Sequence, residues 1–299
     1  MDYRDQVFMA VAEQLSFSRA AESLFISQPA VTKHIRELES KLNTPLFDRK
    51  GNKIHLTKAG LLTYRYYKQI KQKYEEMTFE IGKLTNAYKG VLRIGASSTI
   101  AQYMLPQHLA SFHQKYPHIE LFLLNGNSLE MEQKLMNNEI DLALVENISS
   151  HPDIKYSAFA EDEVVAIAGR NSPLFKRTTI TLAEIQQFPL VVREKGSGTL
   201  ENIEEAFRNK SIDPTQLLVF MHLGSTESIK NFLVDFDGIG FVSEKSIQKE
   251  LMLNTLKQLR IEGITIKRQF RTAVLHGYET SVIDLFVQHL NRVLGGLSV

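Results

Sequence analysis

The sequence predicts three parts: an α-helical N-terminal domain with a small β-hairpin at residues 1–60, a long helix at 61–90, and an α/β domain at 91–299. Three observations predict this division. Two short amphipathic helix patterns are joined by a tight turn within residues 16–42. Apolar residues then repeat in a heptad pattern. From residue 91 onward, strand and helix patterns alternate, with enough units for two α/β lobes.

The composition is typical of a soluble globular protein. The 299 residues allow two or three domains, and 43% of them are hydrophobic and 23% charged. No run of about 18 apolar residues occurs, so no membrane span is expected, and the N-terminal stretch MDYRDQ is unlike a signal peptide. The absence of cysteine excludes disulfides and thiolate metal sites and agrees with a cytoplasmic location.

Charge is divided unevenly along the chain. Residues 1–90 contain 15 Lys and Arg against 10 Asp and Glu, whereas the remainder contains 20 against 24. A basic N-terminal part and an acidic remainder predict that only residues 1–90, the head of the protein, bind a polyanion. An excess of this size also occurs by ordinary scatter, so charge alone does not decide the point.

Three helix patterns make up the N-terminal domain. The first covers residues 3–15 and is expected to pack against the other two. Its apolar face consists of Val7, Phe8, Val11, Ala12 and Leu15. The second has Ser18 as its expected N-cap. Its small apolar face consists of Ala20, Ala21 and Leu24.

The third helix pattern has one buried and one polar face. Ser27 is its expected N-cap, and Pro29 lies in the first turn, where a missing N–H group costs little. The apolar residues, at 4-3-4 spacing, are Val31, Ile35, Leu38 and Leu42. The polar face consists of Gln28, Thr32, Lys33 and Arg36. Amide, hydroxyl and cationic groups in the first turns of a short helix can enter a DNA major groove, although a solvated surface hairpin is an equally good interpretation of this stretch alone.

A β-hairpin is predicted directly after these helices. Lys50, Gly51 and Asn52 form a turn signal, and residues 53–56 alternate polar and apolar like a strand. Cations at the tip of such a wing would contact phosphates beside the groove, although a solvated hairpin is the alternative. The predicted DNA-binding residues are Ser27, Gln28, Pro29, Thr32, Lys33, Arg36, Arg49, Lys50 and Lys53.

A long helix is predicted from its N-cap Thr57 to about Tyr88. Apolar and aromatic residues along it are spaced 3-4-3-4-3-4, which is a heptad seam of about three heptads. The alternative is a helix packed on its own domain. We favour dimerisation, because a single head on a two-fold DNA site would bind weakly. The seam residues are Tyr67, Ile70, Tyr74, Met77, Ile81 and Leu84, followed by Tyr88.

Strand and helix patterns alternate over the rest of the chain. Strands are expected at residues 91–97, 119–126, 140–146, 163–169, 188–194, 217–224, 238–244 and 268–278. Helices are expected at residues 97–117, 127–139, 200–210, 225–235 and 279–294. Such alternation predicts a mostly parallel sheet, with ligands at the carboxyl ends of its strands.

Two of these strand ends carry polar segments that open a helix. Ser97, Ser98 and Thr99 follow the first strand, and residues 196–199 follow the strand at 188–194. Free N–H groups and hydroxyls at both places would bind a carboxylate, sulfate or phosphate. Simple helix capping explains either segment alone, but two such segments facing across a cleft favour a shared ligand.

Glu146, at the end of the strand at 140–146, does not suit a purely anionic ligand, because like charges repel. It would bind a ligand amine or pair with a cation such as Arg193, and the sequence does not choose between these two roles. The predicted effector-binding residues are Ser97, Ser98, Thr99, Glu146, Arg193, Ser197, Gly198 and Thr199.

The residue patterns of common enzymes are missing. His108 and His113 are five positions apart, which suits no usual metal pair, and H-E-x-x-H and G-x-S-x-G do not occur. Residues 238–240, Gly-Ile-Gly, lack the third glycine of a dinucleotide site. No enzyme activity, metal or cofactor is therefore expected. A solute-binding protein, the other rival, would have no use for a DNA-binding head.

Taken together, these residues resemble the LysR-type transcriptional regulators. The resemblance is strongest over residues 17–60, FSRAAESLFISQPAVTKHIRELESKLNTPLFDRKGNKIHLTKAG, and continues more loosely through VLRIGASSTIAQYMLP, IDLALVE and GIGFVSEKSI. It implies a winged helix-turn-helix, a linker helix and a two-lobed effector domain like that of periplasmic binding proteins. It also implies homodimers and homotetramers that bind promoter DNA through paired heads and respond to a small metabolite, with RNA polymerase as a further partner.

The resemblance also implies a place for the effector. In the resembled family, the positions that commonly line the effector cleft match Ser97, Thr99, Glu146 and Thr199. The chain of such domains crosses between its lobes twice, and these crossings are placed near Glu163 and Lys267. Lobe I is then expected at about 91–162 and 268–299, and lobe II at about 163–267.

Overall fold

The computed structural model describes residues 2–50, 53–85 and 87–295, except for the side chains of residues 49 and 50. The chain forms two compact units, residues 1–85 and 86–299, and each is described here by itself. Among the described residues, no helix is long and apolar enough to span a membrane.

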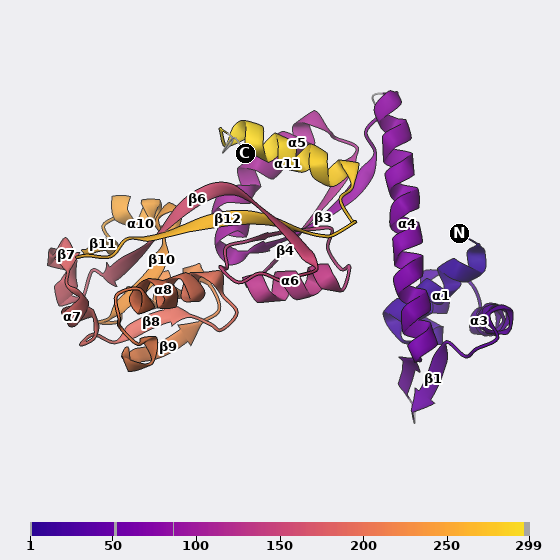
Figure 1. Ribbon diagram of the computed structural model, residues 1–299, viewed down its shortest axis with the longest axis horizontal. Helices are drawn as coiled ribbons and strands as arrows, with labels where there is room; N and C mark the ends of the chain where they lie inside the picture. The colour runs from indigo at the N-terminus through magenta and orange to yellow at the C-terminus, as the bar shows by residue number, and fades with distance from the viewer. Residues whose placement is uncertain (1, 51–52, 86, 296–299) are drawn as a thin grey trace. The chain divides into compact units, whose positions relative to one another are not determined.

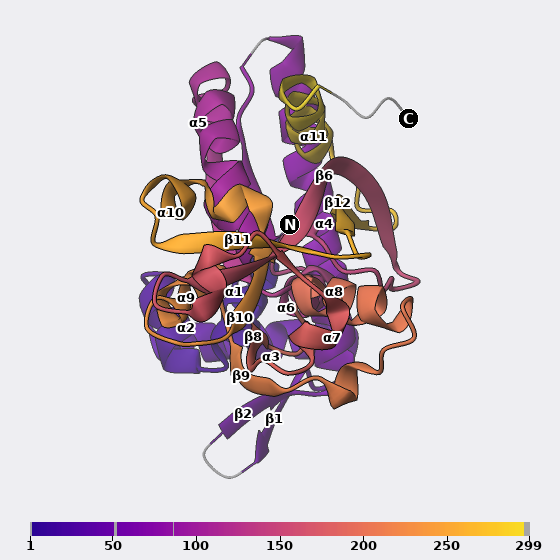
Figure 2. The ribbon, with the colours of Figure 1, turned by 90° about the vertical axis from the view of Figure 1, so that its left-hand side faces the viewer.

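The first unit consists of three short helices, a hairpin and a long helix (Figure 1). Its elements are α1 (Tyr3–Gln14), α2 (Phe17–Ser23), α3 (Gln28–Leu42), β1 (Phe47–Lys50), β2 (Lys53–Leu56) and α4 (Lys58–Leu84). The apolar faces of the short helices meet in one core, which includes Phe8, Val31 and Leu38. Strands β1 and β2 pair antiparallel, with Phe47 opposite Leu56, and form the hairpin seen in Figure 2.

The start of α2 differs from the prediction. Its N-cap is Ser16, whose Oγ accepts from the N–H of Arg19, the third residue of the helix, at 3.3 Å, and Ser18 lies inside the first turn. Phe17 packs edge-on against Phe47, with ring centroids 5.7 Å apart, and this contact fixes the earlier start. Two predicted members of the apolar faces lie half-exposed at helix ends: Leu15 and Leu42.

α4 ends at Leu84, short of the predicted Tyr88. Thr85 closes the helix by donating its N–H to the Gly82 carbonyl at 3.2 Å, and its β-branched side chain does not favour continuation. Tyr88 already belongs to the second unit, where it packs edge-on against Tyr116 with ring centroids 5.1 Å apart. The predicted seam therefore loses its last member.

The second unit is built on a ten-stranded sheet. Its strands are β3 (Gly90–Ser97), β4 (Ile119–Gly126), β5 (Leu142–Val145), β6 (Ile154–Gly169), β7 (Thr179–Ile180), β8 (Leu190–Arg193), β9 (Val219–Leu223), β10 (Ile239–Ser243), β11 (Leu256–Ile261) and β12 (Ile266–Leu275). The order is β4-β3-β5-β12-β6-β10-β8-β9, with β11 beside β6 and β7 beside β11. We name the parallel group β3–β5 the first lobe and the parallel group β8–β10 the second lobe.

Two long strands make the sheet mixed rather than mostly parallel. β6 and β12 pair antiparallel with each other and run through both lobes in Figure 1. Glu163 and Lys267, where the sequence places the lobe crossings, are partners in this register. β6 begins at Ile154, well before the predicted residue 163, because its first half pairs with the second half of β12.

Helices cover both lobes. They are α5 (Leu105–Lys115), α6 (Ser128–Met136), α7 (Leu182–Ile185), α8 (Gly198–Arg208), α9 (Thr226–Leu233), α10 (Gln248–Met252) and α11 (Ser281–Val293). The helix predicted at 97–117 starts later, because β3 continues to Ser97 and Ile100–Met104 form a π-helical turn. Pro106 explains this break, since its ring would clash with the Gln102 carbonyl in an unbroken α-helix.

Two buried histidines lie where α5 packs on α11. The ring nitrogen Nε2 of His289 lies 2.9 Å from Ser111 Oγ, and the His289 ring packs against Phe112 with centroids 5.4 Å apart. Burial, and after it neighbouring positive charge, lowers the pKa of His108 and of His289 below the ordinary value of 6.5.

The stability of the protein is therefore expected to fall as the pH drops below about 6.5. There the unfolded chain takes up protons that the native state, with both imidazoles neutral, does not bind, so acid favours unfolding. Thermal unfolding of the full chain from about pH 7.5 down to about pH 5 measures the slope. The double variant His108→Asn, His289→Gln should flatten it, and an unchanged slope would contradict the assignment to these two histidines.

Candidate DNA-binding face and interlobe site

The polar face of α3 is exposed and slightly hollow. Ser27 caps the helix, and Gln28 Nε2 donates to Thr32 Oγ1 at 3.0 Å, which holds the amide along the first turn. The Lys33 side chain is 77% exposed. The hollow has a volume of about 450 Å³ and is lined by Gln28, Pro29, Thr32, Lys33, Arg36 and Glu37.

The hairpin is tied to this helix by one carboxylate. Glu39 Oε1 accepts from the N–H groups of Leu46 at 2.7 Å and Phe47 at 3.3 Å, so the start of β1 is fixed relative to α3. Lys53 is exposed at the start of β2. The other predicted wing features lie outside the described residues: the side chains of Arg49 and Lys50, and the turn residues 51–52.

The predicted seam of α4 is open to solvent beyond its first member. Tyr67 packs edge-on against Phe8, with ring centroids 5.7 Å apart, and so belongs to the core of the first unit. The later members are 48% to 87% exposed: Ile70, Tyr74, Met77, Ile81 and Leu84. A row of exposed apolar side chains on one helix face is the pattern that a partner helix covers.

Glu146 joins the two predicted polar segments of the second unit. Its carboxylate accepts from the Ser97 hydroxyl of the first lobe and from Thr199 Oγ1 of the second lobe, the latter at 3.2 Å. Asn202 Nδ2 donates to the Glu146 carbonyl at 2.8 Å and to the Gly198 carbonyl at 2.7 Å. The structure thus brings segments from both lobes together at one buried site.

Arg268, missing from the predicted set, is the cation beside Glu146. Its guanidinium lies 3.3 Å from Glu146 and 2.7 Å from Asp162, and Nη1 donates to Thr199 Oγ1 at 2.8 Å. Ser243 Oγ donates to Asp162 at 2.8 Å. The side chains of both ion pairs are at most 1% exposed, so these charges are balanced away from solvent.

Arg193 does not pair with Glu146. Of the two roles that the sequence leaves open for Glu146, pairing with a cation is fulfilled by Arg268 instead. Arg193 Nε and Nη2 donate to the Glu194 carboxylate at 2.8 and 2.9 Å, and Arg193 Nη1 donates to Ser98 Oγ of the first lobe at 2.6 Å. Although burial raises the pKa of Glu194, the Arg193 guanidinium lowers it below its ordinary value. Arg193 therefore links the lobes while its own charge stays paired.

Two hydroxyls at this site have no hydrogen-bond partner among the described residues. They are Thr99 Oγ1 of the first lobe and Ser197 Oγ of the second, in residues that are 2% and 3% exposed. The backbone approaches closely as well, because a Cβ at Gly198 would lie 2.5 Å from the Asn147 nitrogen. Buried hydroxyls without a partner cost free energy unless a ligand or water satisfies them.

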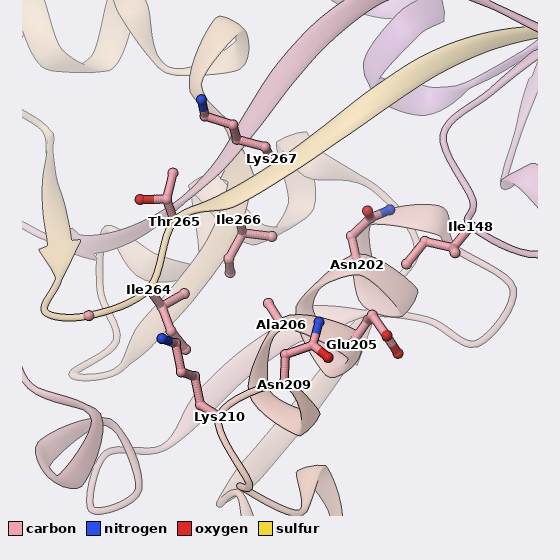
Figure 3. A pocket seen from close by; sticks show the side chains of 11 residues that line it. Ile148, Asn202, Glu205, Ala206, Asn209, Lys210, Ile264, Thr265, Ile266 and Lys267 are labelled. Carbon is pink, nitrogen blue, oxygen red and sulfur yellow. The ribbon is translucent and has the colours of Figure 1, made fainter.

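A pocket of about 320 Å³ adjoins this site through Asn202 (Figure 3). Ile264, Ile266 and Ala206 form its apolar wall, whereas the Lys267 side chain points away from them in Figure 3. Asn202 lines the pocket and also holds the Glu146 carbonyl, so the pocket wall and the interlobe site share one side chain.

A second set of contacts joins the lobes at the π-helical turn. The Tyr103 hydroxyl donates to Glu227 at the start of α9, and Lys230 Nζ lies 5.0 Å from the centre of the Tyr103 ring. Lys230 also pairs with Glu227 at 2.8 Å and with Glu250 at 2.7 Å. Burial, and then the Glu227 hydrogen bond, raises the pKa of Tyr103, so its hydroxyl stays a donor at neutral pH.

Of the two unpredicted charged residues of the site, Arg268 could have been found from the sequence, and Asp162 could not. Alternate residues of β12 are buried, and Arg268 lies on the same strand face as Ile266 and Phe270. A buried arginine must pair with a carboxylate, so this alternation predicts an ion pair at Arg268. Asp162 gave no such signal, because it lies in the part of β6 that the hydrophobic pattern misses. Within the described chain, no cluster of three or more His, Asp or Glu is placed to hold a metal ion.

The fold and these two sites define a DNA-binding regulator with an effector domain, and comparison with known proteins gives its family. Residues 5–61 match the family described as bacterial regulatory helix-turn-helix protein, lysR family, and residues 85–295 match the LysR substrate binding domain. The chain belongs to the LysR family of transcriptional regulators. This finding confirms the fold class and the regulatory function that the sequence predicts.

Three similar proteins illustrate the family. A probable RuBisCO transcriptional regulator of Cyanidioschyzon merolae is 34% identical over 292 residues, which is 96% of each chain. The regulatory domain of Synechocystis CcmR, solved in complex with 2-PG, is 32% identical with a TM-score of 0.63, covering 71% of this chain and all of that one. Full-length CbnR with its target DNA, at 19% identity, shares the fold with a TM-score of 0.68 over 98% and 99% of the two chains.

Proposed function

We propose that this regulator responds to a small molecule with an anionic group that binds between its lobes. The observation that carries the proposal is the pair of buried, unpartnered hydroxyls, Thr99 Oγ1 and Ser197 Oγ, one from each lobe. The Arg193 guanidinium donates to Ser98, the neighbour of Thr99, and the Arg268 guanidinium donates to Thr199, two residues after Ser197. The complex of the similar CcmR regulatory domain with 2-PG supports a small-molecule ligand in this domain.

Glu146 is compatible with such an effector. Its carboxylate is paired with Arg268 at 3.3 Å, so its charge is already balanced and repels an incoming anion less than a free carboxylate would. A ligand that also carries an amine would find a further partner in Glu146. We therefore retain the predicted effector set: Ser97, Ser98, Thr99, Glu146, Arg193, Ser197, Gly198 and Thr199.

We infer the same division of labour along the chain as the sequence predicts. Residues 1–60 bind promoter DNA, residues 61–90 link and pair the heads, and residues 91–299 bind the effector. Gln28, Thr32, Lys33 and Arg36 read base edges, while the wing cations contact phosphates. We propose that the protein works in the cytoplasm as a homodimer or homotetramer and is not an enzyme, since its relatives are transcriptional regulators.

Thr99→Val is expected to weaken effector binding by roughly 1–3 kcal/mol, because the change keeps the shape but leaves a ligand oxygen unpaired. Thermal-shift measurements on the full chain with 2-PG, inorganic phosphate and sulfate first identify a binding anion. A ligand at a hundred times its dissociation constant should add about 2.7 kcal/mol of stability. Isothermal titration calorimetry then compares the variant with the unmodified chain.

Thr280→Val is the matched control for this experiment. Thr280 Oγ1 is also buried without a partner, but it lies at the N-cap of α11, outside the Glu146 network. It should bind the anion normally. Operator binding without effector should persist in both variants, because the first unit is unchanged. Normal anion binding by Thr99→Val would make its segment a helix cap only.

Ile70→Asp combined with Met77→Asp is expected to separate the paired heads. Two carboxylates in an apolar helix interface lose their hydration, which costs several kcal/mol unless the helices dissociate. Light scattering should therefore show a lower mass, and operator binding should weaken. Lys71→Asp with Thr78→Asp places two carboxylates at the same spacing on a neighbouring, exposed helix face and should keep the mass. An unchanged mass in the seam variant would rule out pairing through α4.

A further inference from the structure

A second pocket between the lobes, with a volume of about 340 Å³, lies between α6 of the first lobe and α8 of the second. We call it the α6–α8 pocket. Leu129 and Leu200 are its apolar side chains, and the lobes touch beside it, because the Leu129 N–H donates to the Gly196 carbonyl at 3.1 Å. Of the predicted effector set, only Ser197 lines it, so it is a different place from the Glu146 site.

The wall of this pocket contains a buried carboxylate. Glu132 is 8% exposed, and its Oε1 accepts from Asn147 Nδ2 at 2.8 Å and from the Tyr156 hydroxyl at 2.7 Å. Burial, and after it the Glu132 hydrogen bond, raises the pKa of Tyr156 to about 12, so both donors are neutral at neutral pH. The nearby Arg271 guanidinium lies 4.4 Å from the centre of the Tyr156 ring and donates to the Asn147 carbonyl instead. In the part of the chain that the structure describes, Glu132 therefore has no ion pair, which is costly for a buried charge.

The pocket lining carries more negative than positive charge. Glu132 shares it with Glu201 and Glu204, whereas the lysine of the lining, Lys195, is exposed to solvent. Glu201 accepts from the N–H groups of residues 148 and 149 at 3.0 and 2.9 Å, and Glu204 pairs with Arg208 at 2.8 Å. These two carboxylates are thus already stabilised, and Glu132 is the one that a positively charged ligand would stabilise.

A second acceptor beside Glu132 has no partner. Asn147 Oδ1 accepts no hydrogen bond from the described residues, although the residue is only 6% exposed and lines the pocket. The amide cannot be flipped, because its Nδ2 donates to Glu132 and to the Ser149 carbonyl, and an oxygen in that place would face two acceptors. A carboxylate without a cation and an amide oxygen without a donor therefore occur in the same pocket wall, and an ammonium group supplies both the charge and the donors.

We propose that the α6–α8 pocket binds a small organic amine, whose primary ammonium group donates to Glu132 and to Asn147 Oδ1. The alkyl part of the amine packs on Leu129 and Leu200. A water molecule would satisfy the amide oxygen but would leave the carboxylate without a counter-charge. A divalent metal ion needs more carboxylate or imidazole ligands than the described residues gather in any one place. Because residues of both lobes line the pocket, a bound amine favours this arrangement of the lobes and acts as a second effector.

The test measures binding of n-butylamine and 1,4-diaminobutane, as chloride salts, to the full chain by thermal shift and isothermal titration calorimetry. The buffer contains no phosphate or sulfate, so the result does not depend on the anion site proposed above. Each amine should raise the unfolding temperature by a few degrees and bind with a dissociation constant in the millimolar range or below. 1-Butanol, which has the same alkyl chain without the charge, and potassium chloride at the same ionic strength should have no such effect.

Two variants with matched controls locate the binding. Glu132→Gln removes the charge and should weaken amine binding about tenfold, whereas Glu205→Gln removes an exposed carboxylate of α8 outside this pocket and should not. Without amine, Glu132→Gln should unfold at the same temperature or higher, because the buried charge is gone. Leu129→Lys adds a cation at the pocket and should also weaken binding, whereas Met136→Lys, at an exposed position of α6 outside the pocket, should not.

Four results would overturn the proposal. No effect of either amine over the millimolar range would remove the amine site. An equal effect of potassium chloride would make the pocket a site for monovalent metal ions, and an equal effect of 1-butanol would make it an apolar site. Unchanged amine affinity in both Glu132→Gln and Leu129→Lys would place the binding elsewhere. A lower unfolding temperature of Glu132→Gln without amine would mean that the free protein already stabilises this charge.

Discussion

Replacing Arg268 by Met is expected to lower the free energy of unfolding by about 3–5 kcal/mol, the largest effect of any single change considered for this protein. The substitution leaves Glu146 and Asp162 buried with no cation, since both carboxylates lie within 3.3 Å of this one guanidinium. An unpaired charge away from solvent is far more costly than a lost surface ion pair. Thermal unfolding of the full chain should show a loss of roughly 10 °C.

Two further variants separate charge pairing from packing. Lys267→Met makes the same kind of change one residue earlier, at an exposed position, and should stay within about 0.5 kcal/mol of the unmodified chain. Adding Glu146→Gln to Arg268→Met should recover part of the stability, because it removes one of the stranded charges. A single variant as stable as the unmodified chain would mean that water or a rearranged neighbour neutralises these carboxylates.

Lys33→Ala is expected to reduce discrimination between the operator and random DNA roughly 10- to 100-fold, the range that one good base contact supplies. The Lys33 side chain is 77% exposed on the polar face of α3, so its removal should not affect folding. Gln28→Ala should act in the same direction, because Gln28 starts that face and is held along it by Thr32. Fluorescence anisotropy on both kinds of duplex, over a range of salt concentrations, measures the effect.

Lys53→Ala serves as the comparison, because Lys53 belongs to the hairpin and not to α3. As a phosphate contact, it should weaken operator and random DNA alike and flatten the salt dependence of binding. Equal losses on both duplexes for Lys33→Ala would instead make Lys33 a phosphate contact and leave base reading to other residues of the face.

The sequence predicts well those elements whose pattern is local. The alternating faces of the short helices, the cap at Ser27 and the strands of both parallel groups are visible in runs of a few residues, and the structure contains them. The cap of α2 was misplaced by two residues, because Ser16 and Ser18 are equally good caps in isolation. Only the packing of Phe17 on Phe47, thirty positions away, separates them.

Elements that depend on distant partners are harder to predict. The first half of β6 has polar residues and alternates poorly, and it is a strand because β12 lies beside it. The short strands β7 and β11 pair with each other and were not predicted at all. For the interlobe site, hydroxyls at strand ends were detectable from the sequence. The Arg268 bridge was not predicted, because it joins residues more than a hundred positions apart.

The strand β12 also determines the order in which this chain can fold on the ribosome. β5 is buried along its whole length, and its outer neighbour in the sheet is β12, which begins only at Ile266. During synthesis, β3, β4 and β5 therefore emerge with an apolar edge that nothing can cover until almost the whole polypeptide has been made. The first half of β6 waits for the same strand, whereas its last residues pair with β10 and β11, which are made earlier. A transcript truncated before codon 266 would leave the nascent protein with two unjoined parts of this one sheet, which makes it a substrate for chaperones and proteases.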